Sequence, residues 1–277
     1  MKPYHLAIYL ILLAFFVTVA SPIQAASKVY KVGVVPQFDV RKIQAIWQPI
    51  LTELEKKTNL KLVLVPSNDI PDFERQFLKG EFDLLYLNPY HLLVAKKHQS
   101  YYPILRDHGR MLYGVLTAAK NGKINKVEDL EGKVIAFPAP NALGASLLIR
   151  ASLKQKFGIK FTPRYVKSHS SVYLNVTLGI VAAGGGVQKT LMQQPAEIRD
   201  SLKVIYKTQK VAPHPIAMHP RVKKADARAI TEALLKMGSS PLGKRLLLKI
   251  PIKKIGPAKL EDYSPLMDLG IDQFYVK

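Results

Sequence analysis

The sequence predicts an α/β protein of two lobes, each built on a mixed sheet flanked by helices, with a ligand cleft between them. Strand-like and helix-like segments alternate from residue 29, a second alternating unit begins near residue 111, and a proline-rich segment at 211–222 crosses back. Such alternation is typical of sheets covered by helices. We expect lobe 1 to comprise residues 27–112 and 218–277, and lobe 2 to comprise residues 113–217.

The first unit reads as strand, helix, strand, helix, strand, helix. Residues 29–35 form a β-branched run, and apolar residues between Ile43 and Leu54 then recur at helical spacing. A second strand is expected at 60–66, a helix at 70–80 and a third strand at 82–88. Pro89 then suits the first turn of the next helix.

The second unit repeats the alternation. Strands are expected at residues 111–120, 134–140, 161–166 and 202–207. One helix is expected to begin at Asn141 and another near Ser170. Beyond the crossing segment, helical spacing returns at Ile230, Ala233, Leu234 and Met237.

Composition places the chain among folded globular proteins. Of its 277 residues, 48% are hydrophobic and 22% are charged, which is ordinary for a domain with a buried core. The sequence contains no cysteine. Disulfides, thiolate nucleophiles and metal sites with cysteine ligands are therefore excluded.

The first 26 residues read as an export signal. Lys2 gives a short positive start, and residues 6–20 are apolar but short for a membrane span of about 20 residues. Small residues follow, so we expect cleavage after Ala25 or Ala26 and a periplasmic protein. An uncleaved anchor is the alternative.

The chain is basic, with a formal charge of +21, to which residues 1–26 contribute only Lys2. Nucleic acid, an anionic membrane and a small anion are the three candidate partners. The export signal argues against nucleic acid. Residues 203–259 hold fourteen lysines and arginines against Asp226 and Glu232. Their scatter favours a solvated surface with some attraction for anions.

Ligands of open α/β sheets bind beyond the carboxyl ends of the strands, beside helix N-termini. This rule predicts ligand-binding residues in four loops, at residues 36–39, 86–90, 138–144 and 168–171. The glycine-rich stretch AAGGGVQKT, residues 182–190, is a fifth. We expect the binding residues to come from these five places.

The glycine-rich stretch ends in Lys-Thr like a nucleotide-binding loop but does not match the Walker pattern of such loops. A Walker loop would place glycine at positions 183 and 188, where this chain has Ala183 and Gln188. Two interpretations remain. The glycines form a backbone nest that contacts an anion, or they allow tight packing inside lobe 2.

His169 follows a strand and precedes a helix that Ser168 or Ser170 is suited to cap. Its imidazole either points into the cleft as a donor or lies exposed beside a capped helix. Tyr86 and Asn88 end the third strand, where a core role is the alternative. The histidines are otherwise dispersed, so we expect no metal site.

The loops carry neither G-x-S-x-G nor paired carboxylates, so the sequence does not predict an enzyme. Nothing in it indicates a cofactor.

Four blocks of the chain resemble one family. FDLLYLNPYHLLVA (82–95), WQPILTELEKKTNLKLVLVP (47–66), VEDLEGKVIAFPAPNALGASLLIR (127–150) and YVKSHSSVYLNVTLGIVAAGGGV (165–187) are similar in order and spacing to blocks of the phosphate/phosphite/phosphonate-binding proteins of ABC transporters. The resemblance covers nearly all of residues 28–277. It implies a type II periplasmic-binding-protein fold, whose lobes close on an oxyanion and deliver it to a membrane permease.

The resemblance also implies site residues. Tyr86 stands at the ligand-contacting tyrosine of the family and His169 at its ligand-contacting histidine. The helix start after Pro140 is where the family binds phosphonate oxygens through hydroxyl and backbone N–H groups.

The chain departs from the family at three places and is in this sense a divergent member. Where the family has a hydroxyl-rich run, this chain has Asn-Ala-Leu-Gly at 141–144. Where the family has an acidic residue after the histidine, this chain has Ser170. The glycine stretch stands in place of an acidic residue in a strand of lobe 2. A buried ammonium without a carboxylate would be costly, so an aminoalkyl phosphonate is disfavoured.

We therefore expect a monomeric periplasmic solute-binding protein that captures a small phosphate-, phosphite- or phosphonate-like anion for an ABC transporter. Hinges at 111–117 and 211–222 would close the lobes. A sensory module of the same fold, which would pass the signal to a membrane signalling protein, is the alternative. A periplasmic enzyme is a third hypothesis, but the sequence offers no nucleophile–base pair for one. The expected ligand-binding residues are Gln37, Tyr86, Asn88, Asn141, Ala142, Ser168, His169, Ser170, Gly185 and Gly186.

Overall fold

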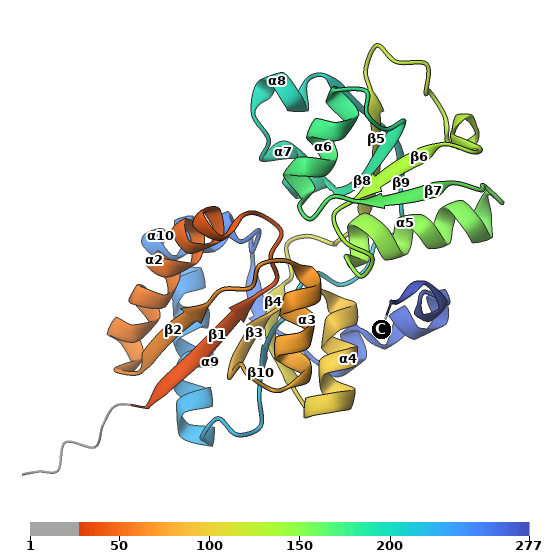
Figure 1. Ribbon diagram of the computed structural model, residues 1–277. Coiled ribbons are helices and arrows are strands. Elements are labelled where there is room, and N and C mark those ends of the chain that lie inside the picture. Colours follow the sequence, from red (N-terminus) through yellow and green to blue (C-terminus); the bar gives the residue numbers. More distant parts are fainter. Residues whose placement is uncertain (1–27, 277) are drawn as a thin grey trace, which may run out of the picture.

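The computed structural model describes residues 28–276. It contains two sheets, each flanked by helices and joined by crossing segments (Figure 1). We call the part around the six-stranded sheet lobe 1 and the part around the five-stranded sheet lobe 2. The expected export signal at residues 1–26 lies outside the described residues.

The sheet of lobe 1 is mixed, as the sequence predicts. β1 pairs in parallel with β2 and β3, whereas β10 runs antiparallel to β3 and β4, and β11 runs antiparallel to β4. The strand order is β11 (Ile255–Pro257), β4 (Tyr102–Asp107), β10 (Ile216–Met218), β3 (Leu84–Tyr86), β1 (Val29–Val34) and β2 (Lys61–Val65).

The sheet of lobe 2 is also mixed. β6 pairs in parallel with β7 and β8, and β5 runs antiparallel to β8 and β9. The strand order is β7 (Thr162–Tyr165), β6 (Val134–Phe137), β8 (Ala183–Val187), β5 (Gly114–Ala119) and β9 (Leu202–Lys207).

Helices cover both sheets (Figure 1). In lobe 1, α2 packs with α9 and α10, while α3 packs with α4. In lobe 2, α6 packs against β8 and α7, and residues 143–156 form one continuous helix that contains α5. The α-helices are α2 (Val40–Thr58), α3 (Ile70–Leu78), α4 (Pro89–Gln99), α5 (Leu148–Ala151), α6 (His169–Thr177), α7 (Gln188–Met192), α8 (Ala196–Arg199), α9 (Lys224–Ser239) and α10 (Pro241–Lys249).

Short polar side chains start five of these helices. Asp39, Asp69, Asn88, Ser168 and Ser240 each accept a hydrogen bond from the backbone N–H three residues later. Such caps satisfy N–H groups that have no partner inside the helix. Local sequence thus fixes where α2, α3, α4, α6 and α10 begin.

Two segments, residues 108–113 and 208–215, connect the lobes. They are tied to each other where Leu112 and Val211 exchange N–H···O hydrogen bonds of 2.9 and 2.8 Å. The connecting segments are displaced from the hinges expected at 111–117 and 211–222, because residues 114–117 belong to β5 and 216–218 to β10. β10 spans the lobe boundary expected at 217/218 and pairs within the sheet of lobe 1.

The C-terminal segment makes a third connection. After β11, short 3₁₀ turns carry the chain back to lobe 2, where its end lies beside α5 (Figure 1). Arg150 donates to the carbonyl of Phe274 at 2.6 Å, and Gln155 donates to that of Gly270 at 3.4 Å. Lobe 2 is therefore held to lobe 1 from its far side as well as through the hinges.

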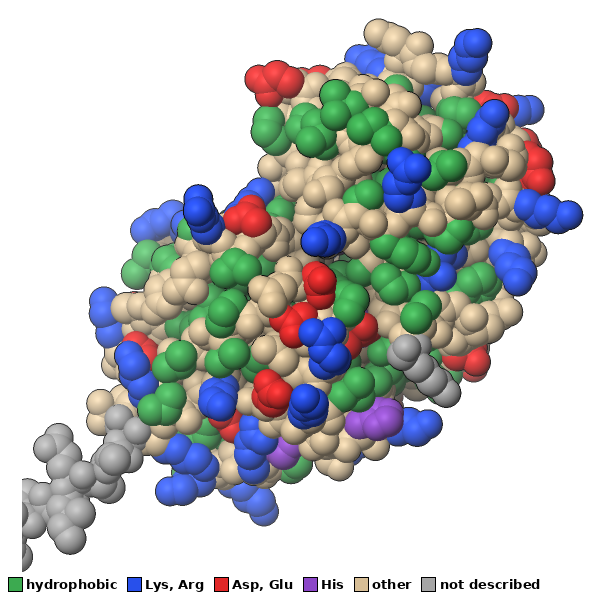
Figure 2. All heavy atoms as spheres, viewed as in Figure 1, with side chains coloured by type: hydrophobic (Ala, Val, Ile, Leu, Met, Phe, Trp, Pro, Cys, Tyr) green, Lys and Arg blue, Asp and Glu red, His purple; other side chains and the backbone are tan. Residues whose placement is uncertain are grey.

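No helix within residues 28–276 combines the length and apolar character that crossing a bilayer requires. On the face shown in Figure 2, lysine and arginine side chains are spread over both lobes, in keeping with the scattered charge of the sequence.

Candidate functional site

A cleft between the lobes opens to solvent, and the empty space among its lining residues, open solvent included, is about 870 Å³. Lobe 1, both connecting segments and the start of α7 in lobe 2 contribute to its walls. The residues lining it include Val35, Gln37, Phe38, Ile43, Ile46, Trp47, Tyr86, Asp107, Arg110, Met111, Tyr113, Val187, Lys189, Thr190, His214, Lys249, Ile250 and Ile252.

Three rings form one wall of this cleft. The ring centroids of Trp47 and Tyr86 are 5.1 Å apart, and Tyr86 stacks on His214 at 5.4 Å with an interplanar angle of 24°. The Tyr86 hydroxyl donates to the carbonyl of Ile250 at 3.1 Å, and burial raises the pKa of Tyr86. The tyrosine therefore stays neutral and presents ring surface to the cleft.

The charged residues that line the cleft are mostly cations. Arg110, Lys189 and Lys249 line it together with one acid, Asp107. One oxygen of Asp107 accepts from the N–H groups of Lys253 and Lys254 at 3.0 and 2.7 Å, and its other oxygen lies 3.7 Å from Arg110. Since that carboxylate is already engaged, the cleft presents a net positive charge.

The ammonium group of Lys189 is destabilised in its charged form. Its partial burial, with the nearby positive charge of Arg110 as a second cause, lowers the pKa of its ammonium group. Two like charges that face one cleft are relieved by an anion placed near both.

A smaller cavity, with about 280 Å³ of empty space including open solvent, adjoins this cleft and shares Val35, Gln37, Val187 and His214 with it. The rest of its wall comes from Ile70, Asn88, the helix start at residues 142–145 and His169. The first N–H groups of that helix have no partner within the helix. Helix N-termini of this kind attract anions.

His169 borders the smaller cavity as a neutral imidazole. It is 2% exposed, and its Nδ1 lies 3.1 Å from the hydroxyl of Thr190, which fixes the position of the ring. Desolvation lowers the pKa of His169 to about 4. Desolvation, with smaller contributions from His91 and His169, also lowers the pKa of His214 to about 3. Both rings can therefore exchange hydrogen bonds with a ligand but carry no charge near neutral pH.

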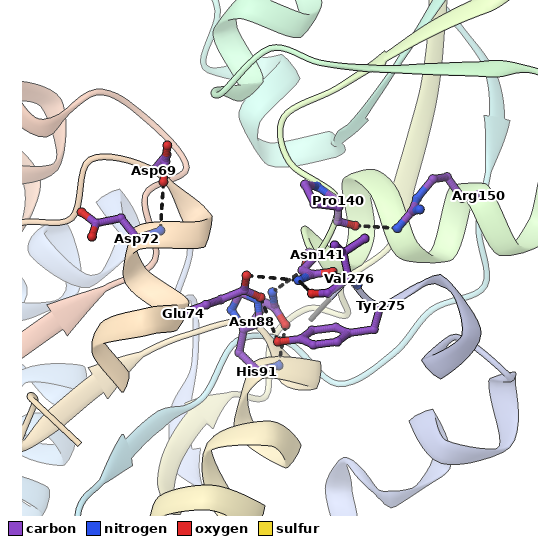
Figure 3. Close-up of polar contacts among 10 residues, drawn as sticks. All are labelled: Asp69, Asp72, Glu74, Asn88, His91, Pro140, Asn141, Arg150, Tyr275 and Val276. Atoms are coloured by element: carbon purple, nitrogen blue, oxygen red, sulfur yellow. Dashed lines mark hydrogen bonds and ion pairs between the residues drawn. The ribbon is translucent and has the colours of Figure 1, made fainter. Parts of the chain in front are cut away.

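Asn88, which lines this cavity, and Asn141 join the two lobes (Figure 3). Asn88 caps α4 through its side-chain oxygen and donates its amide to the carbonyl of Asn141 at 3.1 Å. The amide of Asn141 donates to Glu74 at 3.1 Å and to the carbonyl of Val276 at 2.7 Å, and its oxygen accepts from the N–H of Val276 at 2.9 Å. The side chain of Asn141 is thus fully used within the protein.

Glu74 contacts two further side chains besides Asn141. Its carboxylate accepts from the hydroxyl of Tyr275 at 3.1 Å and lies 2.9 Å from Nε2 of His91, which is fully buried (Figure 3). Glu74 belongs to α3 and His91 to α4, whereas Tyr275 belongs to the C-terminal segment. We call Glu74, Asn88, His91, Asn141, Tyr275 and Val276 the interlobe polar group.

The structure brings together part of the site expected from the sequence. Gln37, Asn88, Ala142 and His169 border the smaller cavity, and Gln37 and Tyr86 line the larger cleft. Five other expected residues line neither: Asn141, Ser168, Ser170, Gly185 and Gly186. The Asn141 side chain is turned to the interlobe polar group, and that of Ser168 caps α6.

The expected anion nest at Gly185 and Gly186 is wrong. The glycines lie inside β8, where their backbone pairs with β5. A Cβ on Gly185 would lie 2.0 Å from the carbonyl oxygen of Ala145, and one on Gly186 would lie 2.0 Å from the hydroxyl of Tyr173. The glycines are needed for close packing, the second of the two interpretations, and the residues that reach the cleft follow them.

Sequence reasoning missed Trp47, Arg110, Lys189 and His214 as cleft residues. Lys189 and Thr190 end the stretch that fails the Walker test, so their proximity to the glycines was a usable signal. Trp47 lies at a core position of an amphipathic helix, and Arg110 lies in a short turn; neither pattern separates a cleft residue from an ordinary one. Among the described residues, no group of three histidine or acidic side chains is arranged to hold a metal ion.

A family model for the periplasmic substrate-binding protein of phosphonate ABC transporters matches residues 32–263. The chain belongs to this family. Its members are substrate-binding components of transporters, which is not a class of enzymes. A curated relative, the phosphate-import protein PhnD of Mycolicibacterium smegmatis, is 24% identical over 200 residues. That match covers 64% of this chain and 62% of the relative, so less than two thirds of the relative is spanned.

Solved structures share the fold. A binding protein of an ABC phosphonate transporter from Pseudomonas aeruginosa has a TM-score of 0.81 at 16% identity, over 90% of this chain and 88% of that one. PhnD1 of Prochlorococcus marinus, solved with methylphosphonate, has a TM-score of 0.81 at 15% identity, over 90% and 99%. The α/β fold of two mixed sheets is thus that of the type II periplasmic binding proteins.

Proposed function

We propose that this chain is a periplasmic solute-binding protein that captures a small phosphorus oxyanion and presents it to the permease of an ABC transporter. The observation that carries the proposal is a cleft between two lobes with three cations and one engaged acid at its wall. Residues 1–26 would export the chain and be removed after Ala25 or Ala26. The protein would act as a monomer and without catalysis.

The oxyanion would enter the smaller cavity. Gln37, Asn88 and His169 border it, and the helix start at residues 142–145 offers backbone N–H groups. The cations of the adjoining cleft add a favourable potential. Closure of the lobes about residues 108–113 and 208–215 would complete the site and signal occupancy to the permease.

Isothermal calorimetry on residues 27–277 against phosphate, phosphite and methylphosphonate tests the proposal. We expect saturable heat with at least one of them, and a loss of about tenfold or more in affinity on His169→Ala, since a buried hydrogen-bonding partner is removed. His98→Ala, on the exposed face of α4, is the matched control and should bind like the native chain. Absence of heat with every oxyanion would refute the phosphorus class.

A further inference from the structure

The larger part of the cleft has an apolar lining that a bare oxyanion would not use. The apolar side chains that line it are those of Phe38, Ile43, Ile46, Trp47, Ile250 and Ile252. Trp47 and Ile250 are almost fully buried, so this surface is a continuation of the lobe 1 core that faces empty space. Apolar surface of this kind gains free energy when a ligand removes it from water.

The two cavities share part of their walls. Val35, Gln37, Val187 and His214 line both, and Nε2 of Gln37 lies 3.4 Å from Nε2 of His214. A ligand that displaces this contact would reach from the smaller cavity to the wall of Trp47, Tyr86 and His214. The empty volume of the larger part is about three times that of the smaller, 870 against 280 Å³. A phosphate or methylphosphonate held in the smaller cavity would leave the larger part to water.

The charges of the larger part restrict what fills it. Its cations are Arg110, Lys189 and Lys249, and its single acid, Asp107, is held by backbone N–H groups and by Arg110. An ammonium group would be repelled here, and the carboxylate of Asp107 is only 1% exposed and so is not accessible to it as a partner. A neutral apolar group suits the wall, and a negative head group suits the surrounding potential.

We propose that the ligand is an organophosphorus anion with an apolar substituent of several carbons, whose oxyanion lies in the smaller cavity and whose substituent lies on the Trp47 wall. This inference rests on the proposed function, since it names the substrate class of the same cleft. It distinguishes the chain from a receptor for phosphate or for an aminoalkyl phosphonate.

The test is a chain-length series measured by calorimetry: phosphate, methyl-, propyl- and butylphosphonate, with 2-aminoethylphosphonate, butanesulfonate, pentanoate and 1-butanol. Each buried methylene should strengthen binding by up to about fourfold. We expect butylphosphonate to bind at least tenfold more tightly than methylphosphonate, and 2-aminoethylphosphonate to bind more weakly than propylphosphonate.

The sole tryptophan of the chain, Trp47, reports where the substituent lies. Butylphosphonate should change the emission of Trp47, because an alkyl chain packs against the part of the ring that lines the cleft. Ile46→Asn places an amide in the wall and should reduce the butyl-to-methyl affinity ratio below threefold. Val63→Asn, on an exposed position of β2, is the matched control and should keep the ratio.

The outcomes separate the two proposals. If phosphate or methylphosphonate binds and affinity does not rise with chain length, the proposed function stands and the apolar substituent is refuted. If butanesulfonate or pentanoate binds and phosphorus anions do not, the apolar wall is supported and the phosphorus class fails. Binding of 1-butanol as tightly as butylphosphonate would refute the need for the anion. No binding by any compound refutes both.

Discussion

At the scale of single residues, the cleft is defined by buried groups that stay neutral. His169 and His214 are removed from water, which lowers the pKa of the first to about 4 and of the second to about 3. In the unfolded chain both rings return to an ordinary pKa of about 6.5. Folding therefore excludes protons from two groups that the unfolded chain would protonate in mild acid.

This difference predicts the pH dependence of stability. Because the folded pKa values are the lower ones, stability is fully present above pH 6.5 and falls as the pH drops from 6.5 toward 4. The slope is at most about 1.4 kcal/mol per pH unit for each histidine. Urea unfolding between pH 7 and 4.5 measures it; His169→Gln and His214→Gln should each flatten the slope, whereas exposed His98→Gln should not. Equal slopes in all four proteins would contradict the buried neutral rings.

At the scale of elements, the central strand of lobe 2 is the unusual part. β8 carries three consecutive glycines, and neighbouring side chains fill the space where theirs would lie. Phe137 occupies the space beside Gly185, and Val172 and Val176 that beside Gly184. Glycine weakens a strand on its own, so the sheet gains this close approach at a cost in backbone entropy.

Replacing one of these glycines should be costly. Gly185→Ala would place a methyl group 2.0 Å from the carbonyl oxygen of Ala145, so strand and helix must move apart. We expect a loss of about 1–3 kcal/mol in the free energy of unfolding. Gly122→Ala is the control, since its nearest contact would be 3.3 Å in a surface turn. If denaturant titrations gave the two variants the same stability, the packing role of β8 would be wrong.

At the scale of the whole molecule, three connections hold the lobes together. The tied segments at 108–113 and 208–215 form the hinge side, and the C-terminal segment closes the far side through the interlobe polar group. Asn141 is central to that group because it bonds α3 and the C-terminal segment from lobe 2. Its side chain is committed to contacts within the protein, although the sequence suggested contact with the ligand.

Asn141→Ala tests this role. The variant leaves Glu74 and both backbone groups of Val276 without their Asn141 partner, which should cost about 1–3 kcal/mol of stability. Thermal and urea unfolding measure the loss, and Asn68→Ala, on an exposed loop, is the control. A variant as stable as the native chain would show that the interlobe polar group does not hold the lobes.

The sequence predicted the architecture because hydrophobic periodicity is local. The alternation from residue 29 onward located β1, α2, β2, α3, β3 and α4, and the second alternating unit with its crossing segment indicated two lobes. The sequence left β8 open between an anion nest and close packing, because its fit depends on Phe137 and Tyr173, which no local pattern connects to glycine. β4, β10 and β11 were also missed, since each is short or pairs with residues distant in sequence.

The site was harder to predict than the fold because it depends on contacts between residues that are distant in sequence. Strand ends and helix starts correctly brought Gln37, Asn88, Ala142 and His169 to one cavity. Arg110 and Lys189 meet only through folding, one from a connecting segment and the other from the end of β8. Whether Asn141 faces a ligand or the protein depends on the C-terminal segment, 135 residues further along the chain.

The apolar interior of lobe 1 extends into lobe 2. Leu143, Ala145, Leu147 and Leu148 belong to the same buried cluster as the lobe 1 core, and the C-terminal segment, through Ile271 and other residues, joins them. The lobes are therefore not exchangeable modules. A chimera that takes lobe 2 from a relative must also take the C-terminal segment, or it would pair two surfaces that evolved against different partners.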